Sequence, residues 1–232
     1  MKLTVTVLAV FLALSLRAQT DADARKVGLI YDLSSYIYHK HVAFMQQDNF
    51  DKYYEQDDSL NVMIQTVFDE TVAAIPGLYV EHLDFFGYEE VDNIVKNRRN
   101  RQLDRFDMLI VVHDAGVIAP GRYETLQFKG RGISTNYEEG VMIYGNLRIE
   151  IINMENRQRR SFDIDEHDEE DLQYKAVRRV IKNFYEVGQK KEDLREDQVE
   201  DIHRNLAEMY RIQIDELLGE DRLGREVVLV MQ

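Results

Sequence analysis

The sequence of 232 residues contains no cysteine. This absence excludes disulfide bonds, thiolate metal sites and cysteine nucleophiles, and it closes the route to a lipid anchor through a modified cysteine. The sequence also lacks the HExxH, GxSxG and SxxK motifs of common hydrolases. The segment Lys129-Gly-Arg-Gly132 has a G-x-G pattern without the GK[ST] ending of a phosphate loop. We therefore predict no cofactor, and we consider an enzyme less favoured than a binding protein.

No apolar run is long enough to span a bilayer. The longest begins at Leu3 and ends at Leu16, and its fourteen residues would extend roughly 21 Å as a helix against a hydrocarbon core of ~30 Å. Lys2 precedes this run, and the small residue Ala18 follows it. The pattern predicts a signal peptide over residues 1–18 and an exported protein, periplasmic or secreted, with no transmembrane segment after cleavage. The alternative is an uncleaved anchor or a buried N-terminal helix.

Basic residues are scarce relative to acidic ones. The formal net charge is −14, and loss of Lys2 and Arg17 with the signal peptide makes it more negative. Such a chain repels nucleic acid, so we predict no nucleic-acid partner. The basic runs Lys96–Arg105 and Arg157–Arg160 are more typical of a solvated helix face and a hairpin tip. No repeat or linker divides residues 19–232, which we predict to form one domain, with a core over 26–187 and a C-terminal helix and strand over 192–231.

The first half of the chain alternates strands and helices. Residues 32–58 have no sustained period, and we interpret them as an irregular, aromatic-rich excursion. Strands are expected at Lys26–Tyr31, Leu78–Leu83 and Phe106–Val112, and helices at 57–75 and Glu89–Leu103. This order is typical of a parallel sheet with helical crossovers.

The second half changes character. After a glycine-rich stretch with a short strand near Tyr123–Phe128, Gly140–Ile152 alternates as one half-buried antiparallel strand, and Arg157–Ile164 returns as its hairpin partner. Helices are expected over Glu170–Val187 and Leu194–Leu218, and a strand over Arg225–Met231. The sequence thus predicts an α/β (mixed α+β) fold: a three-layer unit with a mostly parallel sheet, extended by an antiparallel hairpin, plus two C-terminal helices.

His113 and Asp114 directly follow the strongest predicted strand. Ligands of parallel α/β sheets bind beyond the carboxyl ends of strands, so this pair is a candidate for catalysis, with His113 as a general base. The alternative is that His113 caps the sheet and Asp114 opens a turn, which we favour because no nucleophile elbow or second catalytic partner is visible.

His39 and His41 stand two residues apart, which would place both on one face of a strand. They could share a metal ion if Asp32, Asp48 or His82 supplied a third ligand, but without a recognisable third ligand we predict no metal site. The acidic run Asp163–Asp171 offers oxygen ligands for calcium, but it lacks the glycine and glutamate of an EF-hand loop. Capping of a following helix explains this run better.

The sequence resembles exported envelope proteins related to the curli-secretion lipoprotein. The resemblance rests on the KVGLIY and DMLIVV strands and on the hairpin VMIYGNLRIEIINMENRQRRS, within residues 26–164. This sequence differs from those proteins at Asn153–Arg157, where they have a D-x-x-T-G turn, and it lacks their lipidated cysteine. The resemblance implies an accessory or binding role in the cell envelope and no catalytic residues.

These observations predict a non-enzymatic exported protein that binds another envelope component, and they leave self-association into a homo-oligomer open. The tyrosines of residues 31–54, Tyr36 and Tyr38 among them, are the ligand-binding candidates. The apolar stripe of Leu194–Leu218 either packs on the protein's own sheet, which we favour, or forms an intermolecular seam. The alternative function is an enzyme or small-ligand binder that uses the crevice beside His113.

Overall fold

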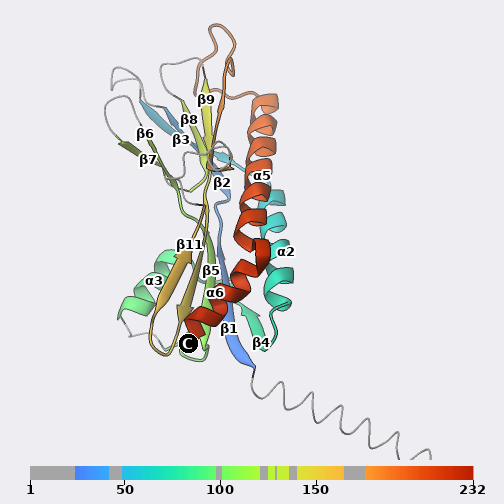
Figure 1. Ribbon diagram of the computed structural model, residues 1–232. Coiled ribbons are helices and arrows are strands. Elements are labelled where there is room, and N and C mark those ends of the chain that lie inside the picture. The colour runs from blue at the N-terminus through green and yellow to red at the C-terminus, as the bar shows by residue number, and fades with distance from the viewer. Residues whose placement is uncertain are drawn as a thin grey trace, which may run out of the picture.

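The computed structural model describes residues 24–41, 49–97, 101–120, 125–128, 130–135, 140–164 and 176–231. Two five-stranded sheets follow one another along the length of the molecule, and a two-stranded ribbon lies beside the second sheet (Figure 1). Within these ranges no helix is both long enough and apolar enough to cross a membrane. The predicted signal peptide lies outside the described residues and stays a prediction.

The first sheet has the strand order β11-β10-β5-β1-β4. Its centre is parallel: β1 (Arg25–Asp32) pairs with both β4 (Leu78–His82) and β5 (Met108–Asp114). Helix α2 (Ser59–Ala73) precedes β4, and α3 (Tyr88–Asn97) connects β4 to β5. Strands β10 (Leu147–Asn153) and β11 (Arg159–Phe162) add the antiparallel hairpin. This arrangement confirms the predicted mostly parallel sheet with its antiparallel extension.

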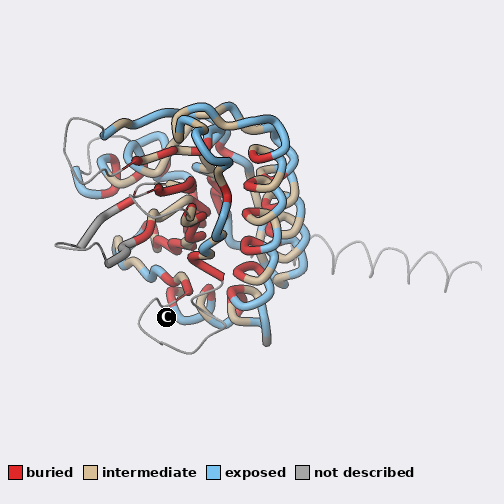
Figure 2. The backbone as a smooth tube through the Cα atoms, turned by 90° about the horizontal axis from the view of Figure 1, so that it is seen from above, coloured by how far each residue is buried: buried red, intermediate tan, exposed pale blue. Residues whose placement is uncertain are grey.

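Helices cover both faces of the first sheet, which gives the predicted three layers. Because side chains alternate along a strand, β5 sends Met108, Ile110 and Val112 into one apolar cluster, and Leu109 and Val111 into the other. The first cluster is closed by α2, α5 (Glu196–Leu218) and α6 (Arg222–Met231), and the second by α3. The helices are buried along their inner sides and exposed along their outer sides (Figure 2).

The second sheet has the order β12-β9-β8-β2-β3. Helix α5 runs along one of its faces, where Arg179 of β12 donates to Asn205 at 2.7 Å and to Glu208 at 2.7 Å. On the other face the ribbon places Phe128 against Tyr144, with ring centroids 4.8 Å apart. The strands are β2 (Tyr36–His41), β3 (Phe50–Glu55), β8 (Gly132–Thr135), β9 (Val141–Tyr144) and β12 (Arg178–Ile181), and those of the ribbon are β6 (Val117–Pro120) and β7 (Thr125–Phe128).

Residues 32–58 contain regular structure where the sequence predicted an irregular excursion. The antiparallel strands β2 and β3 occupy much of this segment. The prediction was wrong because the buried positions of β2 alternate Ile37, His39 and His41. Histidines at buried positions hide the two-residue period that identifies a half-buried strand.

Gly140–Ile152 forms two strands rather than one. β9 belongs to the second sheet and β10 to the first, and Gly145-Asn146 separates them. The alternation continues in phase across this break, so the sequence pattern cannot reveal it. At this break the side chain of Gln213 of α5 bonds to the backbone on both sides. Its Oε1 accepts from Leu147 N at 2.7 Å, and its Nε2 donates to Gly145 O at 2.8 Å.

Two of the predicted C-terminal elements have a different secondary structure. The helix expected over Glu170–Val187 is contradicted at Arg178–Ile181, which pairs with β9 as a strand; residues 170–175 lie outside the described residues. The strand expected at Arg225–Met231 lies in helix α6. In both cases packing overrides local preference: β12 completes the sheet beside β9, and Leu223, Val227 and Val230 form one buried helical face.

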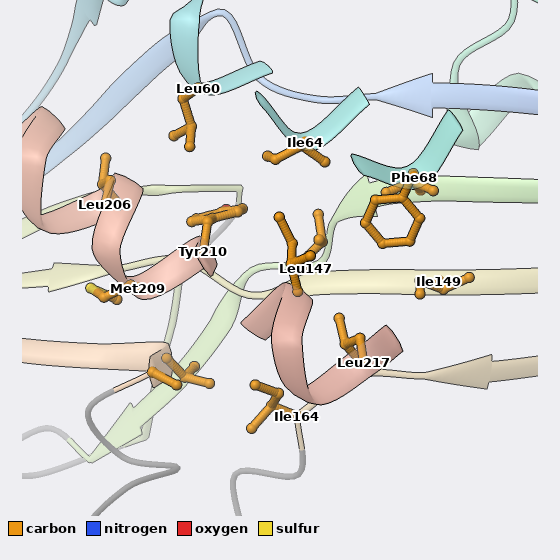
Figure 3. Close-up of a cluster of buried hydrophobic side chains, with 14 of the residues drawn as sticks. Leu60, Ile64, Phe68, Leu147, Ile149, Ile164, Leu206, Met209, Tyr210 and Leu217 are labelled. Atoms are coloured by element: carbon orange, nitrogen blue, oxygen red, sulfur yellow. The ribbon is translucent and has the colours of Figure 1, made fainter. Parts of the chain in front are cut away.

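The shared core contains residues from both halves of the chain (Figure 3). Ile64 and Phe68 of α2 lie against Leu147 and Ile149 of β10, with Leu217 of α5 beside them. Helix α3 ends at Asn97, earlier than the predicted Leu103, and η2 (Gly219–Asp221) turns the chain from α5 into α6. The predicted hairpin tip after β10 is confirmed, since β11 returns antiparallel at Arg159–Phe162.

Candidate functional site

His113 and Asp114 end β5, but they point to opposite faces of the sheet. His113 lies on the α3 face, where its ring stacks on Tyr88 at 4.1 Å between centroids. Asp114 lies on the α5 face, where it contacts Arg131 and Tyr210. Alternation along the strand makes this divergence unavoidable. The two residues therefore do not form the shared crevice that motivated the catalytic interpretation.

Asp114 is the centre of a buried polar cluster. Its Oδ2 accepts from Arg131 Nε at 2.9 Å, from Arg131 Nη2 at 2.7 Å and from Ser34 N at 2.8 Å, and its Oδ1 accepts from the Tyr210 hydroxyl. The guanidinium of Arg131 also lies 4.9 Å from the Tyr210 ring centre. Burial lowers the pKa of Arg131, but Asp114 and Tyr210 together outweigh that effect, so the Arg131 pKa is raised. Burial, with Asp114, raises the pKa of Tyr210, so its hydroxyl stays protonated and donates.

This Asp114 cluster joins the two sheets. Arg131 directly precedes β8 in the second sheet, Asp114 ends β5 in the first, and Tyr210 belongs to α5. Sequence reasoning noted Lys129-Gly-Arg-Gly132 only as an incomplete phosphate pattern. Gly132 is required for another reason: a Cβ there would lie 1.9 Å from the carbonyl oxygen of Tyr38. The Asp114 cluster therefore connects the two sheets, and no sequence motif links Asp114, Arg131 and Tyr210.

His113 lies in a second polar cluster, under α3. Tyr88 donates to Glu150 Oε1 at 3.0 Å, and His113 Nε2 lies 4.0 Å from the same oxygen. Burial lowers the pKa of His113, against the raising effects of Glu150 and Asp32. Arg159 lies 3.8 Å from Glu150 Oε2 and balances its charge. With its ring stacked beneath Tyr88, His113 occupies a packed position rather than an open crevice.

His39 and His41 lie on one face of β2, as their spacing predicted. Both rings contact Thr135: His39 Nε2 lies 3.0 Å and His41 Nδ1 2.8 Å from its hydroxyl oxygen. Since one hydroxyl has one proton, at most one of the two imidazoles accepts it, and the other must donate. Burial lowers the pKa of His39 to about 3, assisted by His41, Lys52 and Lys191.

Of the positions expected to supply a third metal ligand, Asp32 and His82 are engaged elsewhere. His82 lies 3.5 Å from Asp69 on the first sheet, and Asp32 accepts from Tyr88 N at 2.8 Å; Asp48 lies outside the described residues. Across the described residues, no group of at least three His, Cys, Asp or Glu side chains is placed to hold a metal. The histidine pair instead forms hydrogen bonds between β2 and β8.

Tyr36 and Tyr38 lie on the outward face of the second sheet with Tyr53 of β3 between them. Tyr38 is paired with Tyr53 across the strands, and their ring centroids lie 5.1 Å apart. The Tyr36 ring meets the Tyr53 ring edge-on at 6.4 Å. Tyr53 is 66% and Tyr36 48% exposed. We call Tyr36, Tyr38 and Tyr53 the tyrosine surface; the sequence indicated the tyrosines of this segment, but not the pairing that gathers these three.

The apolar stripe of Leu194–Leu218 is interior. Ile202, Leu206, Met209 and Leu217 are buried in the protein's own core. The alternative of an intermolecular seam at this stripe is therefore wrong, because the second sheet and α2 already cover it.

Described residues of the charged runs form ion pairs and hydrogen bonds within the chain. Arg157 pairs with Asp104 at 2.8 Å and Arg160 with Glu226 at 2.7 Å. Asp163, the first residue of the acidic run, accepts from Arg148 Nε at 2.9 Å; residues 165–171 lie outside the described residues. The basic hairpin tip thus faces carboxylates rather than an open surface.

Two cavities do not involve the predicted catalytic pair. One, of about 670 Å³, lies beside β3, and its lining includes His41, Phe50, Asp51, Lys52, Lys191 and Glu192. The other, of about 430 Å³, lies at the opposite end of the first sheet, and its lining includes Arg25, Asp107, Asn153, Arg157 and Val230. His113 and Asp114 line neither.

Comparison with known proteins identifies no family. No protein-family model matches the sequence, and no curated protein matches it. Among solved structures, the chain is similar to a Helicobacter pylori protein described as a neuraminyllactose-binding hemagglutinin homolog, with 8% identity, 90% of each chain covered and a TM-score of 0.36. It is also similar to protein XCC0632 of family DUF330 from Xanthomonas campestris, with 8% identity, 88% and 86% coverage and a TM-score of 0.36.

A third similar structure is the lipoprotein GNA1162 from Neisseria meningitidis. It has 7% identity, covers 81% of this chain and 98% of its own, and has a TM-score of 0.24. Scores this low assign no function, so the argument for function rests on the residues themselves.

Proposed function

We propose that this chain is an exported, non-enzymatic protein, periplasmic or secreted, that binds another protein of the cell envelope. The signal-peptide pattern over residues 1–18 supports export. The divergence of His113 and Asp114 to opposite faces removes the feature that favoured an enzyme or small-ligand crevice.

The tyrosine surface is the observation that carries the binding proposal. Tyr36 and Tyr53 are large side chains left exposed on the outward face of the hairpin. The Tyr53 ring packs against both Tyr36 and Tyr38, which reduces the conformational freedom that a partner would have to restrict on binding. Tyrosine is enriched at protein interfaces because it combines apolar area with a hydroxyl that tolerates water.

Site-specific photo-crosslinking in the native cells tests this proposal. A benzoylphenylalanine placed at position 53 should give one reproducible adduct with an envelope protein. The same probe at Tyr79, which is 60% exposed on the edge strand β4 of the first sheet, is the matched control and should not give that adduct. The partner identified in this way should then bind the purified wild-type chain and lose at least about tenfold in affinity, about 1.4 kcal/mol, for the Tyr36→Ser, Tyr53→Ser double variant.

Three outcomes would contradict the proposal: no adduct at position 53, equal adducts at positions 53 and 79, or adducts only between copies of this chain. The last outcome would indicate a homo-oligomer instead. Unchanged melting temperature of the double variant is the control that separates a lost contact from a lost fold.

A further inference from the structure

Strand β3 is an edge strand next to the tyrosine surface. We propose that β3 binds an extended segment of the partner protein as an additional antiparallel strand of the second sheet, and that this segment carries basic residues on both sides of an aromatic residue. The inference rests on the proposed function, because it specifies how the same surface is recognised. Addition of a strand to a free sheet edge is a common mode of peptide recognition.

Among the described residues, β3 pairs with β2 along one side, and no described strand pairs with its other side. Gln56 N donates to Ser35 O at 3.1 Å, which fixes the phase of the β2–β3 ladder. Antiparallel pairs alternate between bonded and non-bonded positions, so residues 50, 52 and 54 bond to β2. Tyr38 N donates to Arg131 O at 3.1 Å, away from β3, as this phase requires. Asp51, Tyr53 and Glu55 therefore direct their N–H and C=O groups outward.

The two edges of the first sheet are more protected than β3. On β11, Arg160 pairs with Glu226 of α6, which packs against that strand, at 2.7 Å. On β4, Glu81 pairs with Arg105 and His82 lies 3.5 Å from Asp69. A charged residue on an edge discourages pairing, but Lys52 of β3 directs its ammonium to Glu192 O at 2.7 Å on the other face of the sheet. The outward face of β3 carries the exposed charges Asp51 and Glu55, which discourage pairing except with a strand of opposite charge.

The side chains of β3 determine the chemistry of the added strand. Asp51, Tyr53 and Glu55 share the outward face with Tyr38, and all three are exposed. Residues directly opposite one another in an antiparallel pair lie on the same face and interact. A complementary strand therefore places basic residues opposite Asp51 and Glu55 and an aromatic ring opposite Tyr53. The formal net charge of −14 also favours a basic segment.

The first test uses synthetic peptides as the probe. The fluorescein-labelled, end-capped peptide Lys-Val-Tyr-Val-Lys is titrated with the mature chain and followed by fluorescence polarisation. We expect Glu-Val-Tyr-Val-Glu to bind at least about tenfold more weakly, since like charges oppose each other across the strands. The double variant Asp51→Lys, Glu55→Lys should reverse this preference. Equal binding of both peptides, or an unreversed preference, would overturn the inference.

The second test removes a backbone donor without touching the tyrosine surface. Proline is tolerated in an edge strand where its N–H would face solvent, so Glu55→Pro should keep the melting temperature and lose at least about tenfold in peptide affinity. Glu55→Ala is the matched control, which loses the same charge but retains the donor, and it should lose less. Equal affinities of these two variants would overturn the inference. If Glu55→Pro fails to fold, the charge-reversal variant decides.

The two proposals fail separately. If the Tyr36→Ser, Tyr53→Ser variant loses the crosslinked partner but Glu55→Pro binds it as the wild type does, the tyrosine surface is the contact and strand addition is wrong. If position 53 gives no adduct in cells, the proposed function fails whatever the peptides show.

Discussion

The two sheets of this protein differ in how their faces are covered. The first sheet has helices on both faces, and every residue of β5 before Asp114 is buried. Among the described residues, the second has α5 on one face and the β6–β7 ribbon on part of the other, and Tyr53 is 66% exposed. Its interior is also polar, with His39 and Thr135 both inaccessible to solvent. The first sheet is built for stability, and the second retains the surface through which we expect the protein to act.

The largest effect should come from breaking the joint between the sheets. Asp114→Asn would leave Arg131 charged and buried, since the Arg131 side chain is 0% exposed. We expect a loss of roughly 3–5 kcal/mol in the free energy of unfolding, measured by urea denaturation. The matched control is Asp104→Asn, which removes a partly exposed pair with Arg157 and should cost below about 1 kcal/mol. Similar losses for both variants would show that the Asp114 cluster does not join the sheets energetically.

Acid should weaken the second sheet more than the first. Burial lowers the pKa of His39 to about 3 from an ordinary value of 6.5. Between these values the unfolded chain binds a proton that the folded chain does not, so stability falls as pH decreases through this window. One such group contributes a slope of at most about 1.4 kcal/mol per pH unit, or roughly 2–3 kcal/mol between pH 6.5 and 4.5.

Unfolding free energies measured at several pH values would check this slope. The His39→Leu variant should show a shallower dependence than the wild type, while burial keeps a smaller contribution of the same sign from His113. An identical slope in the variant would mean that His39 titrates normally in the folded protein.

The smallest losses of stability should come from single buried methylenes, and they compare the packing around the two sheets. Ile64 of α2 and Ile133 of β8 are both fully buried, so Ile→Val removes the same methylene from each region. We expect about 1 kcal/mol for Ile64→Val and about 0.5 kcal/mol for Ile133→Val, because Ile133 lies opposite His39 in the polar interior of the second sheet, whereas Ile64 lies in an apolar core. Urea denaturation of both variants measures the difference, and a larger loss at Ile133 would reverse the comparison.

The predictable parts of the fold are those with a strong local period. Helix α2 and strand β5 have apolar residues at the spacing that each structure requires, and both were predicted within about two residues. The same reasoning failed at β2, where buried histidines bond to Thr135 from a distant part of the chain. It also failed at Gly145-Asn146, because one uninterrupted alternation serves two sheets.

The candidate sites show the same limit. Sequence position placed His113 and Asp114 together at the end of a strand, but a strand sends consecutive side chains to opposite faces. The partners that decide their roles, Tyr88 for His113 and Tyr210 for Asp114, come from helices that no motif connects to β5. The sequence drew attention to the tyrosines of residues 31–54, but it did not predict strands β2 and β3, whose pairing places Tyr36, Tyr38 and Tyr53 side by side.

Gln213 has a consequence for the order in which this chain can fold. Its amide closes the break between β9 and β10 by bonding to Gly145 O and to Leu147 N, and it also donates to Ala176 O at 2.6 Å. A chain made from its amino end therefore contains β9 and β10, and every other described strand, before the residue that joins β9 to β10 has been added. Until α5 follows, the apolar face of the first sheet has no cover from that helix, and a nearly complete chain exposes surface that favours aggregation.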